Sequence, residues 1–197
     1  MNRAGAGSAV LALLAAGCLA GCANDTATAV TEPPLCPVGN DGAGNGVILM
    51  AQSVPTASWV PCISTSLPLG WAFHHLDARD GLAQFWLDSD RDGTRAIEVR
   101  LEPSCNTAGT TEIASDRDGM RRLERVRQVS PTFAGERHYL FDGGCLSVVF
   151  RLDGDSPGEA LALASQAVGV VSREDLQAQV HEDSGGRLEL DPPGKDG

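Results

Sequence analysis

Between positions 56 and 152 the chain contains short runs in which apolar residues recur at every second position, the period of a β-strand. The pattern is clearest over residues 94–101, where Ile97, Val99 and Leu101 share one face and mostly polar residues share the other. An alternation of this kind is typical of a strand with one buried face. We therefore expect an antiparallel sheet of about five to seven strands within residues 56–152.

Turn residues divide this region into hairpins. Residues 88–93 (Asp-Ser-Asp-Arg-Asp-Gly) separate two strand-like runs and predict a hairpin over residues 82–101. Asp142-Gly143-Gly144 predicts a second hairpin, which joins residues 137–141 to residues 146–152.

The period changes to a helical one after residue 155. Ser156-Pro157-Gly158-Glu159 combines an N-cap residue, a proline at the first helical position and an early acid. Apolar residues follow at helical spacing: Leu161, Ala164, Ala167 and Val168. A second cap, Ser172-Arg173-Glu174-Asp175, predicts another helix through Val180. Strands followed by helices predict an α+β fold with the C-terminal helices packed on one face of the sheet, as a single domain over residues 35–191 before a disordered tail over residues 192–197.

The first 22 residues indicate where the protein resides. The apolar run over residues 9–16 is too short to span a bilayer but suits the core of a secretory signal. Leu19-Ala20-Gly21-Cys22 then resembles, in all four positions, the lipobox of bacterial membrane lipoproteins, with Cys18 as the alternative lipidated residue. The resemblance implies that residues 1–21 are a signal peptide. It also implies that Cys22 carries diacylglycerol and fatty acyl groups such as palmitate, on the extracytoplasmic side of the bacterial cell membrane.

Two segments that follow the lipobox are expected to lack regular structure. Residues 22–34 are rich in Ala and Thr, end in two prolines and show no apolar period, so they predict a flexible tether of roughly 20 Å. Residues 37–46 hold four glycines together with Asn and Asp, which is typical of a mobile loop. Because the tether is short, we expect the partner to be another envelope protein or an envelope polymer.

Four cysteines remain in the body of the chain: Cys36, Cys62, Cys105 and Cys145. An even number of cysteines in an exported protein favours disulfides, and three pairings exist. We prefer Cys36–Cys62 and Cys105–Cys145, because loops of these lengths should each gain about 3–4 kcal/mol from closure. A metal site is the alternative, but the body contains no CxxC or Cys-x-His spacing.

The turn over residues 88–93 also matches the D-x-D-x-D-G opening of a calcium-binding loop. Carboxylates at alternate positions can converge on a hard cation, which makes Asp88, Asp90 and Asp92 candidate calcium ligands. The match stops there, because the twelfth position of the loop is Val99 rather than a bidentate acid. Two interpretations stay open, a tight hairpin turn or a calcium site, and no other cofactor is expected.

The chain has 26 acidic and 15 basic residues, a formal net charge of −11. This balance argues against binding to nucleic acid, which needs a basic face. One basic cluster stands out: Arg121, Arg122, Arg125 and Arg127. These arginines either contact anionic headgroups or wall polymers beneath the anchor, or pair with the carboxylates of the protein itself.

Aromatic residues add a further strand and part of the expected core. Residues 71–77 predict a strand with one side formed by Trp71, Phe73 and His75. We expect the following aromatic side chains to pack in the core rather than to form a ligand platform: Trp59, Trp71, Trp86 and Phe85.

Catalytic signals are sparse. The sequence lacks G-x-S-x-G, H-E-x-x-H and S-x-x-K. Successive residues of a strand point to opposite faces, so His74 and His75 are expected not to chelate one metal together, and His138 and His181 lie on separate elements. We interpret the chain as a lipid-anchored envelope protein that acts as a non-catalytic binding or accessory module. The alternatives are a calcium-binding module and a small envelope hydrolase, which would need a pocket where a His or carboxylate has a displaced pKa.

Overall fold

The computed structural model describes residues 28–37, 42–64 and 66–192. The expected signal peptide, the lipobox, and Cys18 and Cys22 lie outside these residues. The described chain is an α+β protein, as expected. Its elements, in chain order, are β1 (Thr28–Val30), α1 (Asn45–Ser53), β2 (Trp59–Ile63), β3 (Trp71–Arg79), β4 (Leu82–Ser89), β5 (Gly93–Glu102), β6 (Thr111–Ile113), β7 (Arg121–Gln128), β8 (Phe133–Phe141), β9 (Gly144–Leu152), α2 (Pro157–Ala167), β10 (Val168–Ser172) and α3 (Arg173–Asp183).

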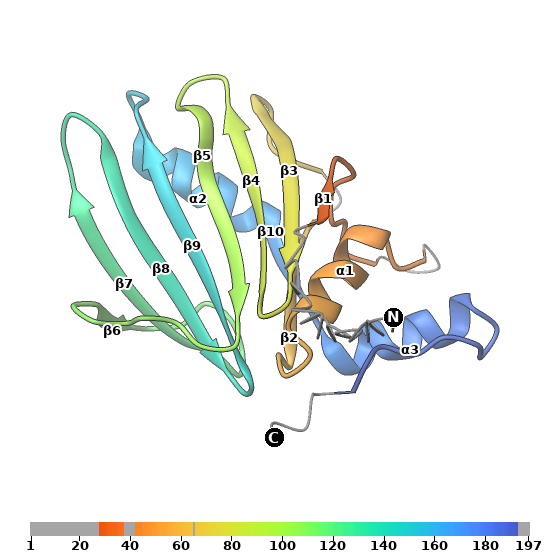
Figure 1. Cartoon of the computed structure of the whole chain (residues 1–197). Helices are drawn as coiled ribbons and strands as arrows, with labels where there is room; N and C mark the ends of the chain where they lie inside the picture. The colour runs from red at the N-terminus through yellow and green to blue at the C-terminus, as the bar shows by residue number, and fades with distance from the viewer. Residues whose placement is uncertain (1–27, 38–41, 65, 193–197) are drawn as a thin grey trace, which may run out of the picture.

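A large antiparallel sheet dominates the fold (Figure 1). It has eight strands in the order β1-β3-β4-β5-β9-β8-β7-β6, and a second sheet pairs β10 with β2. The two hairpins expected from the turn residues are confirmed as β4–β5 and β8–β9. Strand β9 pairs with β5 along one edge and with β8 along the other, so it joins the two halves of the sheet.

Helices and the small sheet bury one face of the large sheet. In Figure 1 α2 lies behind the large sheet, and it contacts β9 and β10. Helix α1 contacts β2, β3 and β4, and α3 contacts β10. The core between these layers includes the fully buried side chains Met50, Leu76, Phe85, Leu101, Leu146 and Leu176. Within the described residues, no helix is both long enough and apolar enough to cross a membrane.

The two C-terminal helices begin where their cap residues predict. Helix α3 starts after Ser172, whose Oγ accepts a hydrogen bond from the backbone N–H of Asp175 at 2.9 Å. Helix α2 follows Ser156 with proline at its first position, although the Ser156 side chain makes no capping bond. The expectation that Val168 continues the helix is wrong. Helix α2 ends at Ala167, and Val168 opens β10 because it pairs with Ile63 of β2.

Three further elements were not expected. Helix α1 begins at Asn45, so the end of the presumed loop over residues 37–46 is helical, while residues 38–41 lie outside the described chain. Strand β1 occupies residues 28–30 of the presumed tether and pairs with β3. Strand β7 carries charged residues on both faces, which hid its two-residue period.

Both expected disulfides are present. Cys36–Cys62 joins the segment before α1 to β2, with Cα atoms 4.9 Å apart. Cys105–Cys145 joins the segment after β5 to the start of β9, with Cα atoms 5.8 Å apart. Each bridge therefore fixes an irregular segment to the edge or the end of a strand.

The core makes a direct prediction about stability. Phe85 is fully buried, so Phe85→Ala should lower the free energy of unfolding by about 3–5 kcal/mol, from lost transfer energy and the cavity left behind. Urea denaturation measures this change. Leu69→Ala is the control, because Leu69 is fully exposed and its removal should leave the midpoint unchanged. Equal destabilisation by both substitutions would contradict the described packing.

Candidate functional site

The face of the large sheet opposite the helices carries an aligned row of polar side chains. Arg100 of β5 pairs in register with Ser147 of β9, which pairs with His138 of β8. Because directly paired residues point to the same face, the three side chains lie side by side across three neighbouring strands. These positions alternate with the core residues Leu101, Leu146 and Tyr139.

A chain segment covers part of this face and creates a polar pocket of about 290 Å³. The segment follows β5 and contributes Asn106 and Ala108 to the pocket wall. It is attached to β9 by the Cys105–Cys145 disulfide. The strands contribute the remaining lining residues: Arg100, Glu102, Arg125, Arg127, Glu136, His138, Ser147 and Val149.

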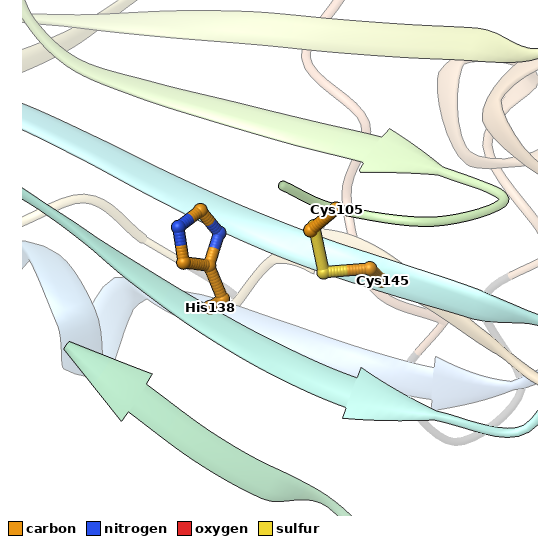
Figure 2. A group of neighbouring side chains, drawn as sticks. All are labelled: Cys105, His138 and Cys145. Carbon is orange, nitrogen blue, oxygen red and sulfur yellow. A yellow bond between two sulfur atoms is a disulfide. The ribbon is translucent and has the colours of Figure 1, made fainter. Parts of the chain in front are cut away.

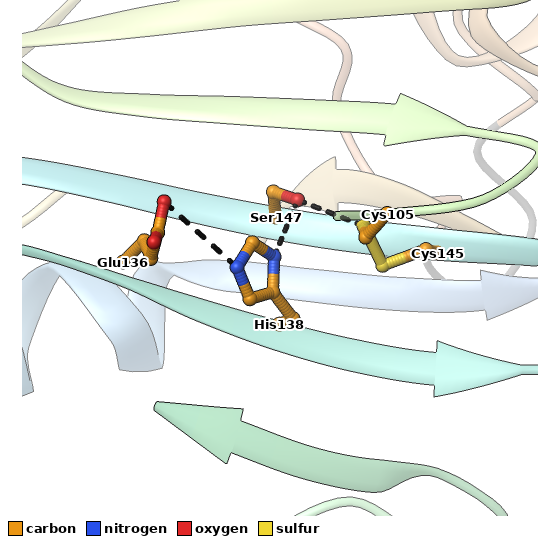
Figure 3. The surroundings of a disulfide bond; sticks show 5 residues. All are labelled: Cys105, Glu136, His138, Cys145 and Ser147. Atoms are coloured by element: carbon orange, nitrogen blue, oxygen red, sulfur yellow. Dashed lines mark hydrogen bonds and ion pairs between the residues drawn. A yellow bond between two sulfur atoms is a disulfide. The ribbon is translucent and has the colours of Figure 1, made fainter. Parts of the chain in front are cut away.

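His138 is the most unusual residue in this pocket. It is only 4% exposed, and its Nδ1 lies 2.8 Å from Ser147 Oγ (Figure 3). Ser147 Oγ lies in turn 3.0 Å from Cys105 Sγ. A disulfide sulfur has no hydrogen, so Ser147 donates to it and accepts the Nδ1–H of His138. The lone pair of His138 then lies on Nε2, which has no hydrogen-bond partner among the described residues and is 3.9 Å from Glu136 Oε2.

The surroundings of His138 keep it neutral. Burial lowers the pKa of His138 because it penalises the imidazolium form, and the charge of Arg127 acts in the same direction. The carboxylates of Glu136 and Glu102 oppose this shift without cancelling it. The pocket thus contains a buried imidazole with a displaced pKa, which the sequence did not identify.

The structure divides the basic cluster between the two faces of β7. Arg121 makes a two-bond contact with Glu112, at 2.7 and 3.1 Å. Arg122 pairs with Glu124 at 3.0 Å and with Asp116 at 3.4 Å, and Arg127 pairs with Glu136. Arg125 forms no ion pair within the described residues. Its guanidinium makes one hydrogen bond there, to the carbonyl of Ala108 at 3.4 Å.

The three candidate calcium ligands point to different partners. Asp88 accepts from the backbone N–H of Arg95 and pairs with His74. Asp92 is buried and accepts from Ser89 Oγ at 2.8 Å and from the backbone N–H of Gly154 at 3.0 Å. Asp90 is exposed, and no group of three potential ligands within the described residues includes any of these aspartates.

The expectation that the rings of His74 and His75 point to opposite faces is wrong, whereas the expectation that they do not chelate one metal together stays a prediction. A β-bulge lies between Phe73 and His75, so the strand shifts by one residue and both rings lie close together, with centroids 4.7 Å apart. His75 consequently leaves the face of Trp71 and Phe73 and stacks on Trp86 at 4.4 Å.

The expected core aromatics are found in two environments. Phe85 is fully buried, and Trp59 and Trp71 pack partly buried against the core. Trp86 points to the opposite face, where it is covered by His75 and by the guanidinium of Arg95, 5.2 Å from the ring centre. None of these residues lines the polar pocket.

One group of potential metal ligands occurs in the described part of the chain: Cys105, His138 and Cys145 (Figure 2). The disulfide occupies both sulfurs, so no thiolate is available in this state. His138 therefore belongs both to the pocket and to the surroundings of the disulfide.

Part of the pocket resembles a catalytic triad in the order of its side chains. Glu136, His138 and Ser147 follow one another in space, as acid, base and nucleophile would. Ser147 nevertheless lies within β9, which is paired along both edges, so nearby backbone N–H groups belong to the sheet ladder.

A second, larger hollow of about 550 Å³ lies between α3 and the small sheet. Its lining includes Trp59, Pro55 and Leu190, and it is mostly apolar. Arg173, which is half-buried in its lining, already donates to the carbonyls of Ala51 and Asp191. This hollow consequently offers mainly apolar contact.

Comparisons with known proteins give no match: no family model, no curated protein and no solved structure resembles this chain.

Asp92 should stabilise the hairpin turn without any metal ion. Asp92→Ala removes an acceptor for Ser89 and for Gly154, so we expect a loss of about 2 kcal/mol of unfolding free energy. Thermal unfolding in calcium and in EDTA measures it, with Asp90→Ala as the matched exposed control. A calcium-dependent rise in the melting temperature that Asp90→Ala abolishes would instead support the calcium site.

His138 should give the protein a distinct pH dependence. Its lowered pKa means that the unfolded chain binds more protons than the folded chain below the usual His value of about 6.5. The stability that comes from neutral His138 is complete above that pH and is lost as the pH falls. His138→Gln should flatten the decline in unfolding free energy between about pH 7.5 and pH 5, whereas His181→Gln should not. If the unfolding free energy falls with the same slope in the unsubstituted protein and in both variants, the lowered pKa of His138 is refuted.

Proposed function

We propose that this protein is a lipid-anchored extracytoplasmic binding module whose polar pocket receives an anionic group of an envelope component. The lipobox resemblance of residues 19–22 supports the anchor at Cys22 and the location. The short tether supports a partner close to the membrane, either another envelope protein or a polymer.

The observation that carries the proposal is the unused hydrogen-bonding capacity in the pocket. Buried polar atoms almost always have hydrogen-bond partners, yet His138 Nε2 has none in the part of the chain that the structure describes. Arg125 lines the same pocket and has a single long contact to a carbonyl. A carboxylate or phosphate oxygen would satisfy Arg125, because a guanidinium binds such oxygens with charge-assisted hydrogen bonds, and it would also satisfy His138 Nε2 once that nitrogen is protonated.

Binding of an anion should be coupled to uptake of a proton. The free pocket holds His138 neutral, with a lone pair on Nε2 that would repel an anionic oxygen. A bound anion favours the imidazolium, whose Nε2–H can donate to it. Affinity should therefore rise as the pH falls toward the pKa of His138.

A comparison of two arginines on the same strand tests the proposal. Phosphate and acetate serve as probes, and NMR chemical shifts of the detergent-solubilised protein report their binding. Arg125→Gln should weaken binding about tenfold, the effect of losing one charge-assisted hydrogen bond of about 1.5 kcal/mol. Arg121→Gln is the control, because Arg121 is engaged by Glu112 and does not line the pocket.

Three outcomes would contradict the proposal: no binding of either probe, equal weakening by both substitutions, or binding that strengthens as the pH rises. Weak binding that responds only to Arg125→Gln and strengthens at lower pH would support it.

A further inference from the structure

We propose that reduction of the Cys105–Cys145 disulfide converts the end of the polar pocket into a site for a thiophilic divalent cation such as Zn²⁺. The ligands are Cys105 Sγ, Cys145 Sγ and His138 Nδ1. This inference does not depend on anion binding, since it concerns the reduced protein and a different atom of His138.

The three ligands are already gathered. Their ligand atoms all lie within 4.8 Å of one another (Figure 2). The Nδ1 side of His138 faces the disulfide, because Ser147 Oγ lies between Nδ1 and Cys105 Sγ at 2.8 and 3.0 Å. Zinc needs ligand distances of about 2.0–2.3 Å. After reduction, small displacements of the two sulfurs and of the imidazole ring would therefore bring all three ligand atoms to these distances from one ion.

The surroundings of His138 fit a metal-bound imidazole. A histidine that ligates through one ring nitrogen usually donates the other N–H to a carboxylate. Within residues 28–37, 42–64 and 66–192, His138 Nε2 lacks a hydrogen-bond partner, and it faces Glu136 Oε2 at 3.9 Å (Figure 3). Once Nδ1 binds the metal, the proton moves to Nε2 and the contact with Glu136 becomes a charge-assisted hydrogen bond. Water from the pocket that His138 and Ser147 line can supply a fourth ligand.

The two sulfur atoms of the disulfide differ in accessibility, which determines which of them a reducing thiolate attacks first. Cys105 is half-buried, whereas Cys145 is 1% exposed. A thiolate of an external dithiol attacks Cys105 Sγ, forms a mixed disulfide and releases the Cys145 thiolate. The second thiol of the reductant then forms its own disulfide and releases Cys105. Two electrons pass to the protein, and metal binding subsequently displaces the proton of each thiol.

The other disulfide provides an internal control. Cys36–Cys62 joins the chain before α1 to β2, and no third ligand of the metal-binding type completes a group around it in the described residues. Its thiols should become available on reduction without forming a site. Alkylation followed by mass spectrometry reports on each cysteine separately, so the two pairs can be compared in one sample.

The test uses the expressed protein in detergent, reduced anaerobically with a phosphine. Co²⁺ titration should give thiolate charge-transfer and tetrahedral d–d absorption at one equivalent, and Zn²⁺ should displace it. Alkylation followed by mass spectrometry should find Cys105 and Cys145 protected by Zn²⁺, while Cys36 and Cys62 react. The oxidised protein should give no such absorption.

Two substitutions test the role of the ring. His138→Gln should weaken Zn²⁺ binding at least tenfold, whereas His75→Gln, on a ring outside the site, should leave it unchanged. The inference is overturned if reduced protein does not bind Zn²⁺, if protection falls on Cys36 and Cys62, or if both variants bind alike. The protection of Cys105 and Cys145 from alkylation is measured in the unsubstituted chain. That measurement therefore tests the inference even if a variant fails to fold.

Discussion

The fold depends on the pairing of β9 along both of its edges. Through β5 and β8 this strand joins the two halves of the large sheet. One of its faces contributes Leu146, Val148 and Phe150 to the core, and the other contributes Cys145 and Ser147 to the disulfide and the pocket. A register shift of one residue would place Ser147 in the apolar core and Leu146 in the pocket, so core packing and site geometry are determined together.

The second constraint is the segment that follows β5. The free face of a sheet normally meets water, which would hydrate its polar side chains. Here the segment is held by Cys105–Cys145 and contributes Asn106 and Ala108 to the wall of the pocket. As a result Glu136, His138 and Ser147 are all less than a tenth exposed. Burial makes an unused nitrogen costly, and this gives His138 its lowered pKa and its capacity for a ligand. The same bridge links the pocket to the redox state of the protein.

Local signals in the sequence were sufficient for much of the fold. Alternation and turn residues predicted the β4–β5 and β8–β9 hairpins, and cap residues predicted where α2 and α3 begin. The signal for α1 was present in the helical spacing of Val47, Met50, Ala51 and Val54, but the preceding glycines obscured it. The bulge in β3 could not be predicted, because an extra residue in a strand is specified by its partner strand and leaves no period of its own.

The sequence by itself determined the α+β class, because alternation, turn residues and caps are local signals, and it favoured the two disulfide pairs that the structure contains over the other pairings. Through the lipobox resemblance it also gives an expectation about location, which rests on four neighbouring residues. Only the tertiary structure decided which polar residues meet. His138 and Ser147 are nine residues apart in the β8–β9 hairpin, whereas Arg100 is distant in the chain, and all three occupy ordinary outward positions of their strands. Strand order and register bring Arg100 beside the other two, and burial beneath the segment that follows β5 changes the chemistry of the group. Both of these effects arise from long-range packing, for which no local pattern in the sequence exists.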